Sequence, residues 1–284
     1  SIASLLQEAL QAYSALLQGL PPESAPLSEL SFADYCVALQ ALRHQPQAQE
    51  AAQRFFEAHL HGVSADQPLE ALGRPPQPMA EDMGAGMGSV RASLASTDME
   101  QLQALARASD ATLGTVLQVA WGVLLSRMSG QRDVVFGVVR AGRHIVPGAQ
   151  NTVGCLINTL PVRVKVEMGV SIDQLLRDMR RYMLGMRPHE HLFLGDLQAW
   201  SDVFAGEGRL NSVVMFEPWP LERRLRELGG PWLQRRFEVH EEGAADMTLA
   251  AYVREGLDLE LEFDRDRLDA GTAERLMASL LTLL

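Results

Sequence analysis

The stretch from Val134 to Val164, VVFGVVRAGRHIVPGAQNTVGCLINTLPVRV, constrains the fold more than any other part of the chain. It contains two segments rich in β-branched residues, which favour strands, and a polar loop with glycines at its joints separates them. The first segment, residues 133–139, is almost continuously apolar, as expected of a strand that is buried on both faces of a sheet. The stretch therefore predicts two strands of a sheet that other elements cover.

Apolar periodicity on either side of this stretch predicts an α/β protein. The first helix, from Ile2, carries its apolar residues on one side, and we expect that side to be buried. Hydroxyl side chains that can cap helices stand at four expected helix starts, namely Ser31, Thr97, Thr112 and Ser171. Helices are predicted over about 2–17, 31–42, 46–59, 97–106, 112–130, 171–183 and 268–284. Strands are predicted over 89–95, 133–139, 211–216, 236–240, 247–253 and 257–263.

Residues 63–88 interrupt this regular pattern. They contain four prolines and four glycines and show little periodicity, which is typical of a linker or loop. The run GAGMG at Gly84–Gly88 resembles a phosphate-binding loop only superficially, because no strand precedes it and no helix follows it directly. We therefore interpret residues 63–88 as a connecting segment.

The composition excludes several classes of function. The 284 residues are 47% hydrophobic, enough for a substantial core, and 25 basic against 36 acidic residues give a net charge of −11. This balance argues against a nucleic-acid partner, which needs a concentrated basic surface. No apolar run approaches the roughly 20 residues of a membrane helix, and no signal peptide is visible. The two cysteines, Cys36 and Cys155, are expected to be separate buried thiols in a reducing cytoplasm.

The common catalytic motifs are missing from the sequence. There is no G-x-S-x-G elbow, no H-E-x-x-H and no Walker loop. His189, Glu190 and His191 could bind zinc together, but no further ligand cluster is apparent, so we predict no metal site. The alternative interpretation of this segment is a polar loop that lines a cleft.

Five segments in order carry a family resemblance. They are FADYCVA (32–38), DVVFGVVRAGR (133–143), VGCLINTLPVRV (153–164), PHEHLFLGDLQAWS (188–201) and RLNSVVMFEPWP (209–220). Together they resemble the condensation domains of nonribosomal peptide synthetases over nearly the whole chain. The departures from the family pattern are Cys36 for Ala, Ala38 for Trp, Asn211 for Asp and Pro218 for Asn.

The resemblance implies a fold similar to chloramphenicol acetyltransferase, with a mixed sheet flanked by helices in each of two lobes and a tunnel between the lobes. It implies that residues 1–62 are helices from the end of the N-terminal lobe, 63–88 the crossing linker and 89–284 the C-terminal lobe. The implied reaction is amide-bond formation between acyl or peptidyl and aminoacyl thioesters. The implied partners are donor and acceptor carrier proteins, which hold the substrates on phosphopantetheine, and neighbouring synthetase domains; no cofactor is expected to bind the chain directly.

The family's catalytic motif, His-His-x-x-x-Asp-Gly, does not occur in the sequence. The opening residues SIASLLQE (Ser1–Glu8) resemble the continuation of that motif, so we expect the histidines upstream of Ser1 and assign no catalytic residue here. Taken alone, this segment also fits any amphipathic helix. Two alternatives stay open: a condensation-like module that binds carrier proteins without chemistry, and a sister domain for epimerisation, heterocyclisation or ester formation.

The resemblance also suggests the substrate-binding residues. Arg143 is the arginine of a Gly-Arg turn. It either pairs with the Asp of the missing motif or is a surface arginine. Asn158 either bonds the backbone where the strands separate or contacts substrate. The remaining candidates line the expected tunnel, with core packing as the alternative for the tryptophan: Asn211, Glu217 and Trp219.

Overall fold

Six strands form one mixed sheet in the order β1-β6-β5-β4-β2-β3. The computed structural model describes residues 2–22, 30–63, 86–201, 204, 210–217, 221–233 and 245–284. The strands are β1 (Met87–Leu94), β2 (Asp133–Ala141), β3 (Ile157–Lys165), β4 (Ser212–Glu217), β5 (Met247–Val253) and β6 (Leu257–Asp264). The longer helices are α1 (Ile2–Leu17), α2 (Phe32–Arg43), α3 (Pro46–Leu60), α5 (Ser96–Ala108), α6 (Leu113–Ser129), α7 (Ile172–Met186) and α10 (Ala270–Leu283). Short helical turns are η1 (Gly142–His144), η2 (Ala149–Asn151), η3 (Arg187–His189), α8 (Leu194–Gln198), α9 (Leu221–Arg226) and η5 (Gly230–Trp232).

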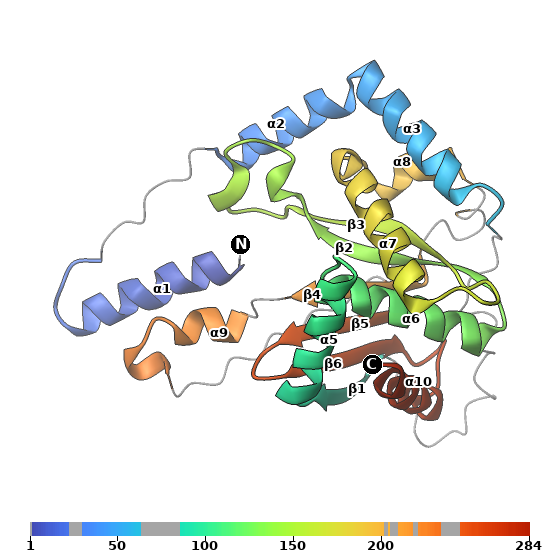
Figure 1. Cartoon of the computed structure of the whole chain (residues 1–284). Coiled ribbons are helices and arrows are strands. Elements are labelled where there is room, and N and C mark those ends of the chain that lie inside the picture. The colour runs from blue at the N-terminus through green and yellow to red at the C-terminus, as the bar shows by residue number, and fades with distance from the viewer. Residues whose placement is uncertain are drawn as a thin grey trace.

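Helix α6 is the centre of the helical layer that covers the sheet. It contacts β2 and β3, and α5, α7 and α10 pack beside it (Figure 1). Thr112 accepts a hydrogen bond from the backbone N–H of Thr115, and Gly130 ends the helix in the left-handed conformation, as the sequence predicts. Gly122 allows the close approach of α6 to β3, because a Cβ there would lie 2.5 Å from Cγ2 of Val164.

The alternation of residues along β6 shows how the two faces of the sheet differ. The apolar residues of its sequence LDLELEFD are buried, and the acidic residues between them are only partly buried. On the polar face, Glu260 accepts hydrogen bonds from Ser89 and Arg91 of β1. The strand therefore has one core face and one face closer to solvent, as the period of two predicts.

The two strands of the 134–164 stretch form an antiparallel pair, with Asp133 opposite Lys165 and Ala141 opposite Ile157. On its other side β2 runs parallel to β4, but the described pairing covers only Gly137 with Val213 and Val138 with Val214. Beyond these residues β2 continues beside β3, and β4 continues beside β5. The sheet therefore divides at the carboxyl ends of β2 and β4.

The loop that follows β2 lies against α2, which comes from a distant part of the sequence (Figure 1). The hydroxyl of buried Tyr35 donates a hydrogen bond to the backbone oxygen of Gly142 at 3.2 Å. Tyr35 forms a small apolar cluster with Val146, Ala149 and Leu156. This cluster fixes the position of η1 and η2 relative to α2.

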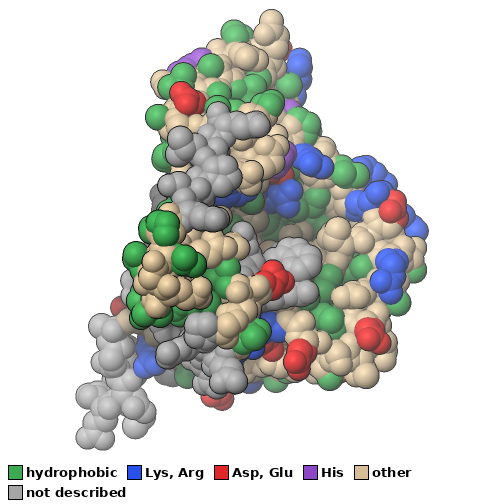
Figure 2. Space-filling view, turned by 90° about the vertical axis from the view of Figure 1, so that its left-hand side faces the viewer, with side chains coloured by type: hydrophobic (Ala, Val, Ile, Leu, Met, Phe, Trp, Pro, Cys, Tyr) green, Lys and Arg blue, Asp and Glu red, His purple; other side chains and the backbone are tan. Residues whose placement is uncertain are grey.

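Five expectations from the sequence need correction or concern residues that the structure does not describe. Helix α1 has the predicted bounds, but Leu5 is 51% and Leu16 is 61% exposed, so its apolar side is not buried. Hydrophobic side chains accordingly lie at the surface on this side of the molecule (Figure 2). Thr97 lies inside α5, which starts after Ala95 without a side-chain cap. The expected strand 236–240 and residues 64–85 of the expected linker lie outside the described residues, and β1 starts at Met87 rather than Ser89.

The expectation of two buried thiols is wrong, because Cys36 and Cys155 are both exposed. Cys36 follows buried Tyr35 on α2, and adjacent helical residues point about 100° apart. Cys155 lies in the loop before β3. An apolar local sequence is therefore a poor guide to burial at these two positions.

No single helix in the described ranges is long and apolar enough to cross a membrane. Helices α5 and α6 pass this test only as a pair, by length and composition, and the pair is bent by 96°.

Candidate functional site

A buried carboxylate, Glu190, lies where the divided sheet meets the loop between α7 and α8. Its side chain is 1% exposed, and Oε1 accepts hydrogen bonds from Nε and Nη2 of Arg140 at 2.8 and 2.7 Å. Arg140 is near the carboxyl end of β2, beyond the last residue that pairs with β4. Because an unpaired buried charge is costly, this ion pair ties the α7–α8 loop to β2.

His144 is the second basic side chain beside Glu190. It ends η1, and its Nε2 lies 3.3 Å from Oε2 of the carboxylate. That oxygen has no hydrogen-bond partner among the described residues. The imidazole of His144 therefore faces the carboxylate oxygen that Arg140 leaves unpaired.

Asn158 fastens the same loop to β3. Its Nδ2 donates hydrogen bonds to the backbone oxygens of Glu190, at 3.0 Å, and of Leu192. Its Oδ1 accepts from the backbone N–H of Thr159 at 2.9 Å. These contacts are all with backbone groups, and a contact between Asn158 and substrate stays a prediction.

Arg143 also bonds backbone groups. Its Nη1 donates to the backbone oxygens of Gln150 and Thr152 at 3.0 and 2.7 Å, and Ala149 O lies at 3.4 Å. These contacts close the loop between β2 and β3 around one guanidinium. The expected pairing of Arg143 with an aspartate of the histidine motif stays a prediction.

Of the other three predicted residues, Asn211 and Glu217 lie at opposite ends of β4. Asn211 is 3% exposed and precedes β4, and its backbone oxygen accepts a hydrogen bond from Met247. Glu217 ends β4 opposite Tyr252, so β4 separates it from Asn211 by roughly 20 Å. Trp219 lies outside the described residues.

The α7–α8 loop is also joined to α2. Nη2 of Arg43 donates to Oδ1 and Oδ2 of Asp196 at 2.8 and 2.9 Å, and the guanidinium lies 4.3 Å from the ring centroid of Phe193. A guanidinium that pairs with a carboxylate and stacks on an aromatic ring has a well-defined position. This contact therefore fixes the end of α2 relative to Glu190.

The two histidines on either side of Glu190 both have lowered pKa values. His191 is 2% exposed, and its Nδ1 donates to the backbone oxygen of Pro188 at 3.0 Å. Burial lowers the pKa of His191, and burial together with the nearby His191 lowers the pKa of His189. Among the residues that the structure describes, no group of three histidine, cysteine or acidic side chains could hold a metal ion.

Arg140 and His144 are functional candidates that were not predicted from the sequence, and Glu190 was predicted only as a possible zinc ligand or as part of a polar loop that lines a cleft. Arg140 follows an apolar run in β2, and a charged residue at such a position is a signal for a buried ion pair. Its partner lies 50 residues away, which the sequence does not reveal.

Comparison with solved structures identifies the fold of the chain. The chain matches the first condensation domain of the CDA synthetase with a TM-score of 0.76 and 22% identity, over 99% of this chain and 60% of that one. It matches the X-domain from teicoplanin biosynthesis with a TM-score of 0.72 and 20% identity, over 98% of this chain and 64% of that one. The fold is therefore the α/β fold of condensation domains, which is similar to chloramphenicol acetyltransferase, as the sequence predicts.

The family model named Condensation domain matches residues 1–284, so the chain belongs to the condensation domain family. Similar relatives are linear gramicidin synthase subunits C and D of Brevibacillus parabrevis, which are 29% identical over 285 residues and 30% identical over 287 residues. Both alignments cover 100% of this chain but only 4% and 5% of the relatives. Condensation domains of these synthetases are acyl-transferring enzymes, and this class is consistent with amide-bond formation.

Proposed function

We propose that the chain is part of a condensation domain that joins an acyl or peptidyl thioester to an aminoacyl thioester through an amide bond. The observation that carries this proposal is the family match over residues 1–284. In the proposal, a donor and an acceptor carrier protein present the substrates on phosphopantetheine, and neighbouring synthetase domains supply those carriers. The relatives support this view, because they are synthetase subunits much longer than the chain.

The chemistry of amide formation defines what the chain has to contribute. The attacking amine must be placed beside the thioester carbonyl, and the negative charge on the tetrahedral oxygen must be stabilised. An imidazole near neutral pH can act as a base toward the amine or hold it in position. The sequence contains no adjacent histidine pair, so we propose that residues outside these 284 supply the family's histidine motif.

In this proposal the divided end of the sheet is the part of the chain closest to the substrates. Arg140, His144 and Glu190 hold the α7–α8 loop against β2, and Asn158 holds it against β3. The role of these residues is to keep both sides of the substrate tunnel in a fixed position. Arg143 is the candidate partner of the motif's aspartate, because a guanidinium can bind a carboxylate with two hydrogen bonds.

The test is an assay with two loaded carrier proteins, read by intact-protein mass spectrometry. One arm contains the 284-residue chain alone, and the other contains a polypeptide in which a lobe with His-His-x-x-x-Asp-Gly precedes the chain. We expect amide product only in the second arm, and mutation of the second histidine of the motif should abolish it. Product from the chain alone at a rate near that of the longer polypeptide would contradict the proposal.

A second candidate function is carrier or protein binding without chemistry. The observation that favours it is the likeness to the X-domain from teicoplanin biosynthesis in its complex with OxyB, with a TM-score of 0.71 and 21% identity. The same assay separates the two functions. A longer polypeptide that binds both loaded carriers but forms no amide would support binding alone.

A further inference from the structure

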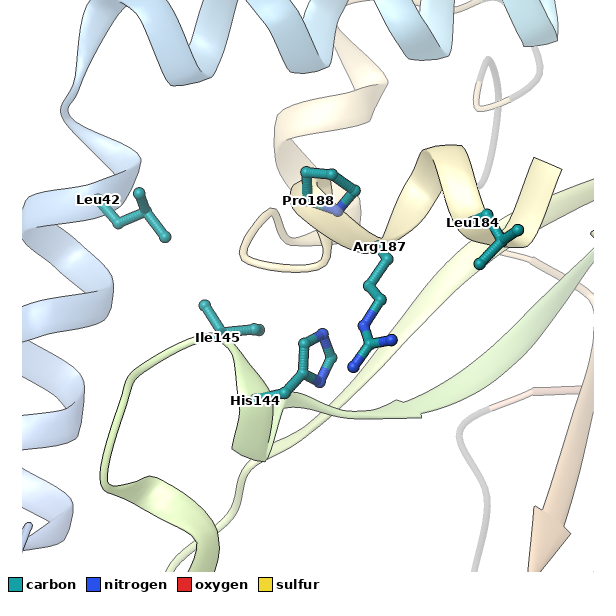
Figure 3. A pocket seen from close by; sticks show the side chains of 6 residues that line it. All are labelled: Leu42, His144, Ile145, Leu184, Arg187 and Pro188. Carbon is teal, nitrogen blue, oxygen red and sulfur yellow. The ribbon is translucent and has the colours of Figure 1, made fainter. Parts of the chain in front are cut away.

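A small pocket opens next to Glu190, at the junction of α2, η1 and the end of α7. Its volume is about 270 Å³. Its walls come from three separate parts of the sequence, as Figure 3 shows. The lining residues are Leu42, His144, Ile145, Leu184, Arg187 and Pro188.

One side of the pocket carries two basic side chains. Figure 3 shows the guanidinium of Arg187 and the imidazole of His144 side by side. His144 lies 3.3 Å from Oε2 of Glu190, and Oε1 of the same carboxylate is paired with Arg140. Arg187 is exposed, and no hydrogen bond or ion pair of its guanidinium occurs in the part of the chain that the structure describes. The charge of Arg187 is therefore uncompensated at the pocket.

The other sides of the pocket are apolar. Leu42 and Ile145 lie across from Arg187 in Figure 3, and both are partly buried. Leu184 is 54% exposed at the edge of the pocket, although it is a large apolar residue on a helix that is otherwise amphipathic. A free cation next to apolar side chains is suited to a ligand that has an anionic end and an apolar body.

We propose that this pocket binds a compact organic anion, namely a carboxylate attached to a small apolar group. The carboxylate contacts Arg187, which can bind it with two parallel hydrogen bonds, and the apolar group contacts Leu42 and Ile145. The volume lies below the range of about 300–1,000 Å³ for sites of drug-sized ligands, which restricts the ligand to a small molecule. This site goes beyond the proposed function, because it requires neither carrier proteins nor amide formation.

The first experiment is isothermal titration calorimetry of the 284-residue chain with sodium phenylacetate. We expect saturable binding with a Kd on the order of 1 mM, as is typical for a ligand of this size. Phenylacetamide, which has the same shape without the charge, should bind at least about tenfold more weakly. Inorganic phosphate, which has charge without an apolar group, should also bind more weakly. Equal or tighter binding of phenylacetamide or phosphate would overturn the proposal, as would the absence of saturable binding by phenylacetate.

Matched variants on α7 and η3 locate the site. The substitution Arg187→Gln should weaken phenylacetate binding about tenfold or more, and Leu184→Asn should weaken it to a smaller extent. Arg181→Gln is the control, because the Arg181 side chain is 75% exposed on α7 and pairs with Asp178 outside the pocket. Arg187 is exposed, so its substitution is expected to leave the circular dichroism spectrum unchanged. Binding by Arg187→Gln within about twofold of the parent would overturn the assignment, and neither result bears on amide formation.

Discussion

Arg140 and Glu190, 50 residues apart in the sequence, meet through two hydrogen bonds of 2.8 and 2.7 Å to one carboxylate oxygen. This contact joins the end of β2 to the loop between α7 and α8, and the carboxylate is almost completely buried. The substitution Glu190→Ala leaves the Arg140 guanidinium without its partner. We therefore expect it to lower the free energy of unfolding by about 3 kcal/mol, measured by urea denaturation of the 284-residue chain.

Two further variants test whether the missing ion pair causes the lower stability of Glu190→Ala. Glu190→Gln keeps an oxygen that can accept from Arg140 but removes the charge, so its effect should be smaller than that of Glu190→Ala. Glu255→Ala removes an exposed carboxylate and should change the stability by less than about 0.5 kcal/mol. Equal stability of Glu190→Ala and the parent would show that the ion pair does not hold the loop.

A substitution of Asn158 tests whether the hydrogen bonds that its amide donates to the α7–α8 loop stabilise the chain. Its Nδ2 donates to two backbone oxygens of the α7–α8 loop, and an aspartate at this position would place carboxylate oxygen against both of them. We expect Asn158→Asp to destabilise the chain by about 2 kcal/mol in urea denaturation. Asn151→Asp introduces the same charge at an exposed position and serves as the control. If both substitutions lower the free energy of unfolding equally, the effect comes from the change in net charge and not from the lost hydrogen bonds.

Structural features that depend on residues close together in the sequence could be predicted, whereas contacts between distant residues could not. Ser31, Thr112 and Ser171 cap their helices as predicted, because a cap depends on residues only three positions away. The start of α5 is the exception: the helix begins at Ser96, one residue before Thr97, and has no side-chain cap. Most bounds of helices and strands could therefore be predicted within a few residues.

The packing of α1 and the candidate site could not be predicted in this way. Periodicity in α1 shows which residues share a side of the helix, but not what covers that side, and Leu16 is in fact 61% exposed. The contact of Arg140 with Glu190 depends on where β2 leaves β4 and on where α7 ends. Neither relationship is encoded in a short stretch of sequence.

The lowered pKa values of the two histidines beside Glu190 predict a dependence of stability on pH. Burial lowers the pKa of His191 in the folded state, whereas an unfolded histidine has a pKa of about 6.5. The unfolded chain therefore binds more protons between these two values, and the free energy of unfolding falls as the pH decreases through that window. The same sign holds for His189, whose pKa is also lowered by burial.

Urea denaturation between about pH 7.5 and pH 5.5 measures this effect. The double substitution His189→Gln and His191→Gln should flatten the pH dependence, although it also lowers the stability at pH 7.5. His61→Gln, which removes an exposed histidine, should leave the slope unchanged. A slope that survives the double substitution would mean that other groups cause the acid sensitivity.

Gly122 and Gly195 provide a matched test of how closely α6 lies on the sheet. A Cβ at Gly122 would lie 2.5 Å from Cγ2 and 2.7 Å from Cβ of Val164, whereas a Cβ at Gly195 in α8 meets nothing within 4 Å. Because both atoms of Val164 belong to a buried strand, α6 would have to move away from β3 to admit a methyl group. We expect Gly122→Ala to cost about 2 kcal/mol and Gly195→Ala to change the stability by less than about 0.5 kcal/mol, both measured by urea denaturation. Restoration of the lost stability by the second substitution Val164→Ala would identify the steric contact as the cause, and a lack of any rescue would argue against it.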